Sequence, residues 1–272
     1  MDKLSDPHLL LTNQYKNASN LDTRIQFHDR FSTNKYGWHR WIFDRVRCPP
    51  KSKILELGCG TGLLWAKNRD RIPTEWDLIL SDFSPGMLRE AQNEMGGVHQ
   101  RMDFMQIDAQ SIPFKNSTFD VIFANSMLYH VPDMERALSE IHRVLRSPGI
   151  LYAATGGKTD GLGLKGWVRK AQPSINEKTK DIELDQSFSL ENGASALAPW
   201  FAKVSLHRYQ DSLEITEVDP LVDYVQSTIS MRLDERNLSE FRRIVTEEID
   251  LHGAVRIAKS GGIFEARKPD GV

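Results

Sequence analysis

The chain has 272 residues, of which 40% are hydrophobic and 26% are charged, and this composition is ordinary for a globular protein with a full core. Its length allows one large α/β domain or two small ones. Lys and Arg total 35 against 37 Asp and Glu, so the formal net charge is −2. A dedicated nucleic-acid binder usually carries a basic excess, and this balance argues against one.

The first 50 residues predict a helical segment. Apolar side chains recur at steps of three and four in two runs, Leu21, Ile25, His28, Phe31 and then Trp38, Trp41, Ile42, Val46. Residues 34–37 (NKYG) predict the turn between the two helices, and Pro49 and Pro50 end the second one. We therefore expect residues 1–50 to form an N-terminal helical cap segment.

From residue 51 the pattern changes to short apolar runs that alternate with helical periods. Strands are predicted at 53–57, 76–80, 100–107, 119–124 and 150–154, and helices at 61–71, 85–95 and 134–145. Residues 147–149 (SPG) predict a turn before the fifth strand. This alternation predicts a parallel sheet covered by helices on both faces.

Beyond residue 155 the alternation breaks. Glycines between positions 156 and 166 indicate a mobile stretch, and residues 167–185 are polar with a weak helical tendency. Further on we expect a helix at 189–198, a strand at 204–215, helices at 219–230 and 238–251, and a final strand at 262–267. Residues 51–272 are predicted to form one domain with a helical insert at about 216–252.

The most specific motif follows the first predicted strand. In residues 54–62 (ILELGCGTG), the strand brings Glu56 to its carboxyl end and three alternate glycines follow, Gly58, Gly60 and Gly62. Without a Cβ, such a turn can adopt positive φ and let a ligand lie against the main chain. A dinucleotide fingerprint needs a glycine at position 63, which is Leu63, and a P-loop needs a Lys directly after Gly62. A turn with only a structural role stays open for this motif alone.

A single carboxylate marks the end of the second predicted strand. Asp82 lies twenty residues after Gly62. Its two oxygens could accept hydrogen bonds from the two hydroxyls of a ribose. The alternative is that Asp82 only caps the next helix, but Ser84, followed by Pro85, suits that position already.

Taken together, these segments resemble the motifs of the class I S-adenosylmethionine-dependent methyltransferases, type 11 small-molecule subgroup. The E-x-G-x-G-x-G spacing is similar to the family's first motif. Residues 107–114 (IDAQSIPF), 119–131 (FDVIFANSMLYHV) and 145–151 (LRSPGIL) resemble its later motifs in the right order. Ser147 and Ile150 depart from the family's usual L-K-P-G-G turn. The resemblance implies a Rossmann-like α/β fold, with a mostly parallel seven-stranded sheet, an antiparallel last strand and helices on both faces.

The resemblance also implies S-adenosyl-L-methionine as the cofactor. It assigns Asp82 to the ribose, Asp108 to the adenine amino group and Asn125 to the amino-acid part of the cofactor. The full set of implied cofactor-binding residues is Glu56, Gly58, Cys59, Gly60, Gly62, Asp82, Phe83, Met87, Asp108, Ala109, Gln110 and Asn125.

The acceptor side is less patterned. His130 is the candidate general base, since it follows the fourth strand where the family places acceptor-facing groups, and a structural role for it is the alternative. Candidate acceptor contacts are Tyr15, Tyr36, Trp38 and Trp167. Trp38 could instead be a core residue at helical spacing. No carboxylate cluster resembles a magnesium site, so no metal is expected.

The expected function is methyl transfer to a small-molecule acceptor. The alternatives are a methyltransferase acting on RNA or protein, which predicts a basic face, and a non-catalytic cofactor-binding partner protein. Cys48 and Cys59 form no C-x-x-C pair, no secretory signal is evident, and no run approaches about 18 apolar residues. We therefore expect a cytoplasmic protein with neither membrane nor nucleic acid as partner. The acceptor and the oligomeric state stay open.

Overall fold

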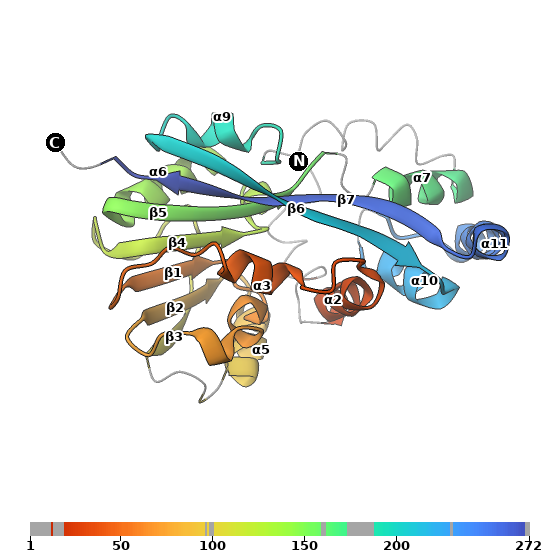
Figure 1. The fold of residues 1–272 in the computed structure, drawn as a ribbon, viewed down its shortest axis with the longest axis horizontal. Helices are drawn as coiled ribbons and strands as arrows, with labels where there is room; N and C mark the ends of the chain where they lie inside the picture. The colour runs from red at the N-terminus through yellow and green to blue at the C-terminus, as the bar shows by residue number, and fades with distance from the viewer. Residues whose placement is uncertain are drawn as a thin grey trace.

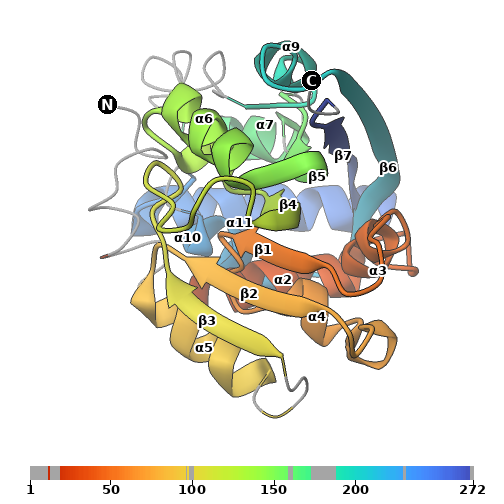
Figure 2. The same ribbon diagram turned by 90° about the vertical axis from the view of Figure 1, so that its left-hand side faces the viewer.

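The computed structural model describes residues 19–95, 97, 101–158, 162–172, 188–228 and 231–269, together with Thr12. Within these residues, a seven-stranded sheet has the order β3-β2-β1-β4-β5-β7-β6 (Figures 1 and 2). The strands are β1 (Lys53–Leu57), β2 (Asp77–Asp82), β3 (Met102–Gln106), β4 (Phe119–Asn125), β5 (Leu145–Gly156), β6 (Lys203–Ile215) and β7 (Val255–Arg267). β1 to β5 pair in parallel, and β7 runs antiparallel to both β5 and β6. The predicted fold class, with its antiparallel last strand, is confirmed.

Helices connect the strands and cover the sheet. In chain order they are α2 (Ser19–Phe31), α3 (Trp38–Phe43), α4 (Leu63–Ala66), α5 (Pro85–Met95), α6 (Met134–Val144), α7 (Leu162–Ala171), α9 (Gly193–Leu197), α10 (Val218–Ser227) and α11 (Glu235–His252). Two short 3-10 turns, η2 (Arg69–Arg71) and η3 (Leu128–His130), follow α4 and β4.

Both faces of the central strands β1, β2 and β4 are buried, and successive side chains of each strand point to opposite faces. Leu55 and Leu57 pack with α6 and α9 on one face. Ile54, with no exposed surface, packs with α3, α4 and α5 on the other. Burial on both sides explains why the central strands appear in the sequence as continuous apolar runs.

A third core lies beyond the sheet. The β5–β7 pairing stops at Gly156 and Gly261, whereas β6 and β7 continue as a pair as far as Ile215 and Val255. Helices α2, α7, α10 and α11 gather around this extension, which Figure 1 shows at the right. We call these four helices the cap. The N-terminal α2 thus packs on the late insert, with the Phe27 ring 4.6 Å from that of Tyr224. The division of the chain at residue 50 remains a proposal.

Several elements differ from their sequence-based prediction. The stretch predicted to be mobile forms α7 from Leu162 onward, because Leu164 and Val168 bury their side chains in the third core. The helix predicted at 61–71 is only α4 and η2. β7 begins at Val255 rather than 262, because its first half pairs with β6. The predicted turn at 147–149 is an irregularity inside β5, where three extra residues lie between its pairings with Phe119 and Val121.

Candidate active site

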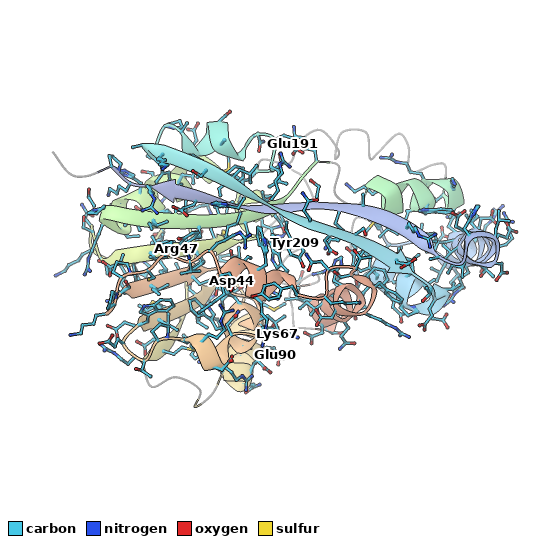
Figure 3. All side chains as sticks on the ribbon, in the orientation of Figure 1. Asp44, Arg47, Lys67, Glu90, Glu191 and Tyr209 are labelled. Carbon is cyan, nitrogen blue, oxygen red and sulfur yellow. The ribbon has the colours of Figure 1, made fainter. Side chains whose placement is uncertain are left out.

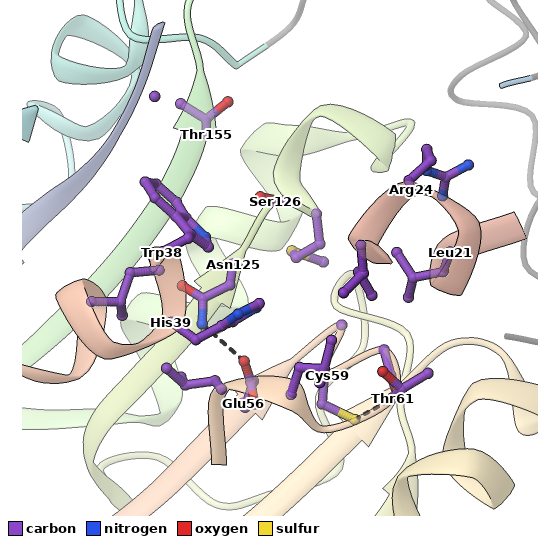
Figure 4. A pocket seen from close by; sticks show the side chains of 18 of the residues that line it. Leu21, Arg24, Trp38, His39, Glu56, Cys59, Thr61, Asn125, Ser126 and Thr155 are labelled. Carbon is purple, nitrogen blue, oxygen red and sulfur yellow. Dashed lines mark hydrogen bonds between the residues drawn. The ribbon is translucent and has the colours of Figure 1, made fainter. Parts of the chain in front are cut away.

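A cavity of about 780 Å³ opens where the carboxyl ends of β1, β2 and β4 face the cap. This volume is typical of small-molecule sites, and the position is the crevice expected for ligands of an open α/β sheet. Its walls come from the glycine turn, the ends of β2 and β4, residues 107–110, helices α2 and α3, and the β6–β7 pair (Figure 4).

The glycine turn after β1 is held tightly in place. Its glycines have positive φ, of 66° at Gly58, 57° at Gly60 and 77° at Gly62. The Cys59 amide donates to the carbonyl of Ser81 at 2.8 Å, which fixes the turn over the end of β2. A Cβ on Gly58 would lie 2.7 Å from the Cβ of Met127, so only glycine fits at this position.

Glu56 is the buried centre of the site, with 2% of its surface exposed. Its carboxylate accepts hydrogen bonds from Trp65 Nε1 at 2.6 Å and from Asn125 Nδ2 at 2.8 Å, the second of which Figure 4 shows. Burial raises the pKa of Glu56 to about 7, against the lowering effect of these two bonds.

The other end of Asn125 is an unsatisfied acceptor. Its Oδ1 is buried and has no hydrogen-bond partner among the residues that the structure describes. A buried carbonyl oxygen without a donor is costly, so a ligand that brings an N–H group to this point is stabilised. The Glu56 carboxylate behind Asn125 adds negative potential. Together they suit a ligand ammonium group.

Asp82 links the end of β2 to the glycine turn. Its Oδ2 accepts from the Gly60 amide at 2.9 Å and its Oδ1 from the Ser84 amide at 2.8 Å. Burial raises its pKa to about 6. Each carboxylate oxygen can still accept a further hydrogen bond. The helix-cap position belongs to Ser84, whose hydroxyl accepts from the Met87 amide at 3.3 Å, so Asp82 remains available to a pair of ligand hydroxyls.

The adjacent wall combines polar and apolar groups. Asp108 Oδ1 accepts from the Gln110 backbone amide at 2.9 Å and from its Nε2 at 3.0 Å, which fixes the loop after β3. Ala109 lines the cavity beside them. Phe83, 38% exposed, and Met87 supply apolar surface. Such a wall suits a flat heteroaromatic ring with a hydrogen-bonding edge.

Helices α2 and α3 close the cavity from the side of the cap. A Cβ on Gly60 would lie 3.3 Å from the Leu21 side chain, so α2 lies directly above the glycine turn. Trp38, His39 and Asn125 all line the cavity, and Figure 4 labels all three. Burial lowers the pKa of His39 to about 4, which keeps its imidazole neutral at pH 7. Nothing in the sequence had distinguished His39 from a surface residue.

Trp38 serves both the cavity and the core. It stacks on Trp41 with ring centroids 5.4 Å apart, and its indole covers Gly261 of β7. Tyr209 of β6, near the middle of the molecule in Figure 3, packs edge-on against Trp38 at 5.2 Å. Trp38 therefore lines the cavity and also packs against the core. Its contact with the acceptor stays a prediction.

The structure brings most of the predicted residues together. All the cofactor-binding candidates except Gly62 line the cavity; the space beside Gly62 is filled by Ala91 and Met95 of α5. His130, on η3, also lines it. Tyr36 lies at its edge, half exposed, with its hydroxyl bonded to Asp44.

The placement of two acceptor candidates needs separate comment. Trp167 is not among the cavity-lining residues: it lies on α7 against the third core, with the Lys170 ammonium 4.1 Å from the centroid of its ring. The aromatic character that suggested an acceptor contact is used in packing. Tyr15 lies outside the described residues.

The sequence also missed the far wall of the cavity. Arg24 and His28 of α2, Tyr224 of α10 and Lys259 of β7 all line it. The periodic run at Leu21, Ile25, His28 and Phe31 predicted a helix but not what its side chains contact. Leu21, Ile25 and His28 line the cavity, and the buried residues of α2 are Phe27 and Phe31. A histidine inside an otherwise apolar stripe was the one available signal.

Known proteins share this domain. Residues 55–153 match the family described as "Methyltransferase domain". The ubiquinone/menaquinone biosynthesis C-methyltransferase UbiE of Xanthomonas oryzae pv. oryzae is 29% identical over 114 residues, which are 41% of this chain and 45% of that protein. The chain therefore spans about half the length of the curated relatives it matches.

Solved structures share the fold. A putative methyltransferase from Bacillus halodurans has a TM-score of 0.59 at 17% identity, covering 85% of this chain and 98% of that one. The phosphoethanolamine N-methyltransferase 2 of Haemonchus contortus, solved with phosphomonomethylethanolamine and S-adenosylhomocysteine, has a TM-score of 0.59 at 14% identity, covering 100% and 61%. In the described residues, no helix is long and apolar enough for a membrane span, and no three His, Cys, Asp or Glu side chains form a group that could hold a metal ion.

Proposed function

We propose that the chain is a class I S-adenosylmethionine-dependent methyltransferase, which transfers the methyl group of this cofactor to a small-molecule acceptor. The observation that carries the proposal is the buried, unsatisfied Oδ1 of Asn125 beside the Glu56 carboxylate, at the end of a glycine turn that admits close backbone approach. This acceptor and the nearby carboxylate support binding of the ammonium group of an amino-acid ligand.

Each part of the cofactor has a matching wall. The amino-acid part would be held by Asn125 and the glycine turn, the ribose hydroxyls by Asp82, and the adenine by Asp108 with Phe83 and Met87. When bound, the cofactor supplies an electrophilic methyl carbon on a sulfonium.

The protein's own contribution is alignment and exclusion of water. Trp38 and the α2 helix enclose the space above the glycine turn. An acceptor that must lose a proton needs a base, and we propose His130 for this role because it lines the same cavity. Burial lowers the pKa of His28 to about 3 and that of His39 to about 4, which makes both weak bases.

A labelling experiment distinguishes the classes of acceptor. The protein is incubated with methyl-labelled S-adenosylmethionine and a cell extract, and the label is measured in the small-molecule, RNA and protein fractions. We expect the label in the small-molecule fraction. Label confined to RNA or to protein would contradict the proposed acceptor class. The same incubation with the Asp82→Asn variant measures the label incorporated when cofactor binding is weakened.

Replacing Asp82 with asparagine is expected to weaken cofactor binding about tenfold to a hundredfold, because hydrogen bonds to a charged group contribute about 1.5–3 kcal/mol. Calorimetric titration with S-adenosylhomocysteine measures the change. The matched control is Asp103→Asn, at an exposed position on the neighbouring strand β3, which should bind like wild type. Equal cofactor affinity in the two variants would show that Asp82 does not bind the cofactor.

Cofactor affinity is expected to rise as the pH increases through about 6 and about 7. The pKa values of Asp82 and Glu56 are raised to these values by burial, so both carboxyls are partly protonated in this window. A cationic ligand favours the ionised forms and lowers both pKa values, so binding releases protons. Titrations in two buffers of different ionisation enthalpy count these protons, and proton uptake on binding would contradict the assignment.

A further inference from the structure

The wall of the cavity formed by the cap carries a cluster that cofactor binding does not use. Its members are Arg24 and His28 on α2, Tyr224 on α10 and Lys259 on β7, and all four line the cavity. Arg24 and His28 are one helical turn apart on the same face of α2. Figure 4 shows Arg24 on the cap side of the cavity, away from Glu56 and Asn125.

Lys259 and His28 are in direct contact. The Lys259 Nζ lies 3.3 Å from the His28 Nδ1. An ammonium can only donate, so Nδ1 accepts and the ring hydrogen is on Nε2. Burial, with Lys259 and Arg24 nearby, lowers the pKa of His28 to about 3, so this imidazole does not compete with Lys259 for a negative partner. The Tyr224 ring lies edge-on to His28, 5.4 Å away.

The carboxylate opposite Lys259 in the sheet is engaged elsewhere. Asp211 lies directly across from Lys259 in the β6–β7 register. Its Oδ1 accepts from the Ser32 hydroxyl at 2.7 Å and from the Asn34 amide at 3.1 Å, which directs it to the turn between α2 and α3. Among the described residues, no carboxylate lies within the 4.0 Å ion-pair distance of Lys259. The half-buried Lys259 ammonium therefore lines the cavity, and two of its three N–H groups make no hydrogen bond to the described residues.

We propose that the methyl acceptor carries a carboxylate and that Lys259, oriented by His28, binds it. The proposal rests on the proposed function and names the class of acceptor. A single ammonium matches the single charge of a carboxylate rather than a phosphate dianion, and the Arg24 guanidinium already donates to the Ser227 carbonyl at 3.0 Å. The pairing of a carboxylate with Lys259 anchors the acceptor at the cap, opposite the wall that would hold the cofactor.

The experiment uses intact protein saturated with S-adenosylhomocysteine and labelled with ¹⁵N-histidine, in which the ring signals of His28 are assigned with His28→Gln. The probes are two carboxylates, acetate and benzoate, each compared with its neutral amide. We expect saturable shifts of the His28 signals with the carboxylates and none with acetamide or benzamide. Acetate is small enough to reach Lys259 whatever the rest of the acceptor is.

Variants then test Lys259 itself. Lys259→Met should weaken benzoate binding by about tenfold to a hundredfold, as expected for a lost hydrogen bond to a charged group, and Lys259→Arg should keep most of it. The matched control is Lys67→Met, since Lys67 lines the same cavity but is paired with Asp29 at 3.2 Å. Each variant should bind S-adenosylhomocysteine like wild type, which also shows that it is folded.

The outcomes separate the two proposals. Equal shifts with carboxylates and amides, no shift with any carboxylate, or unchanged benzoate binding in Lys259→Met would overturn this inference while the proposed function stands. Tighter binding of phenyl phosphate than of benzoate would overturn the choice of a carboxylate. Failure of the wild-type protein to bind S-adenosylhomocysteine would overturn the proposed function itself, and this inference with it.

Discussion

Replacing Gly58 with alanine is expected to lower the affinity for S-adenosylmethionine by at least about a hundredfold, since it removes the close backbone approach and displaces the neighbouring turn. Gly58 has a φ of 66°, and a Cβ there would lie 2.7 Å from the Cβ of Met127. Left-handed backbone alone costs about 1–2 kcal/mol for a residue with a side chain. The clash adds to this, because either the turn or the loop after β4 must move. Calorimetric titration measures the affinity.

The matched control separates backbone strain from the clash. Gly253, at the end of α11, has a φ of 76°, and a Cβ there would meet nothing within 4 Å. Gly253→Ala should therefore lose only the stability that backbone strain costs, about 1–2 kcal/mol in thermal unfolding. It should keep its cofactor affinity. If Gly58→Ala, folded by circular dichroism, binds as tightly as wild type, the glycine turn does not hold the cofactor.

Replacing Glu56 with glutamine is expected to weaken cofactor binding by roughly a hundredfold, about 3 kcal/mol, because the negative charge behind Asn125 is lost. Glu56 accepts from both Trp65 Nε1 and Asn125 Nδ2. An amide has only one acceptor oxygen, so one of these donors would meet an NH2 group. Asn125 would then turn, and its Oδ1 would no longer be free for the ligand ammonium.

The pH dependence of binding tests the same variant independently. The wild-type protein should release protons near pH 7, where Glu56 titrates, and Glu56→Gln should retain only the step near 6 that belongs to Asp82. Glu94→Gln is the control, since Glu94 is exposed and paired with Arg69 at the surface. A Glu56→Gln variant with wild-type affinity and an unchanged pH profile would show that Glu56 serves only to position Trp65.

The cavity wall at the ends of β1, β2 and β4 could be predicted because each strand end has its own signal in the sequence. Glu56, Asp82 and Asn125 lie at or next to the ends of parallel strands, and such strands deliver their carboxyl ends to one edge of the sheet. Apolar runs and glycine spacing in the sequence therefore predict both the fold and the position of the cleft. The structure adds what the sequence could not, that Asn125 is held by Glu56 with its Oδ1 left without a partner.

The cap could not be predicted in the same way. It depends on the β6–β7 extension, in which Lys259 meets His28 from 231 positions earlier in the chain. No local period signals such a contact. The glycines of α7 indicated a mobile stretch. The burial of Leu164 and Val168 outweighs the weak helix propensity of these glycines. The wall of the cavity formed by the cap is thus a product of tertiary packing, and its residues came together only in the structure.

The central claim is that the cavity above the glycine turn holds S-adenosylmethionine, and one measurement tests it most directly. Wild-type protein of confirmed fold is titrated calorimetrically with S-adenosylmethionine and with S-adenosylhomocysteine at pH 8, where the Glu56 and Asp82 carboxyls are ionised. We expect saturable heat at one ligand per chain for both compounds. No saturable heat with either compound would contradict the account.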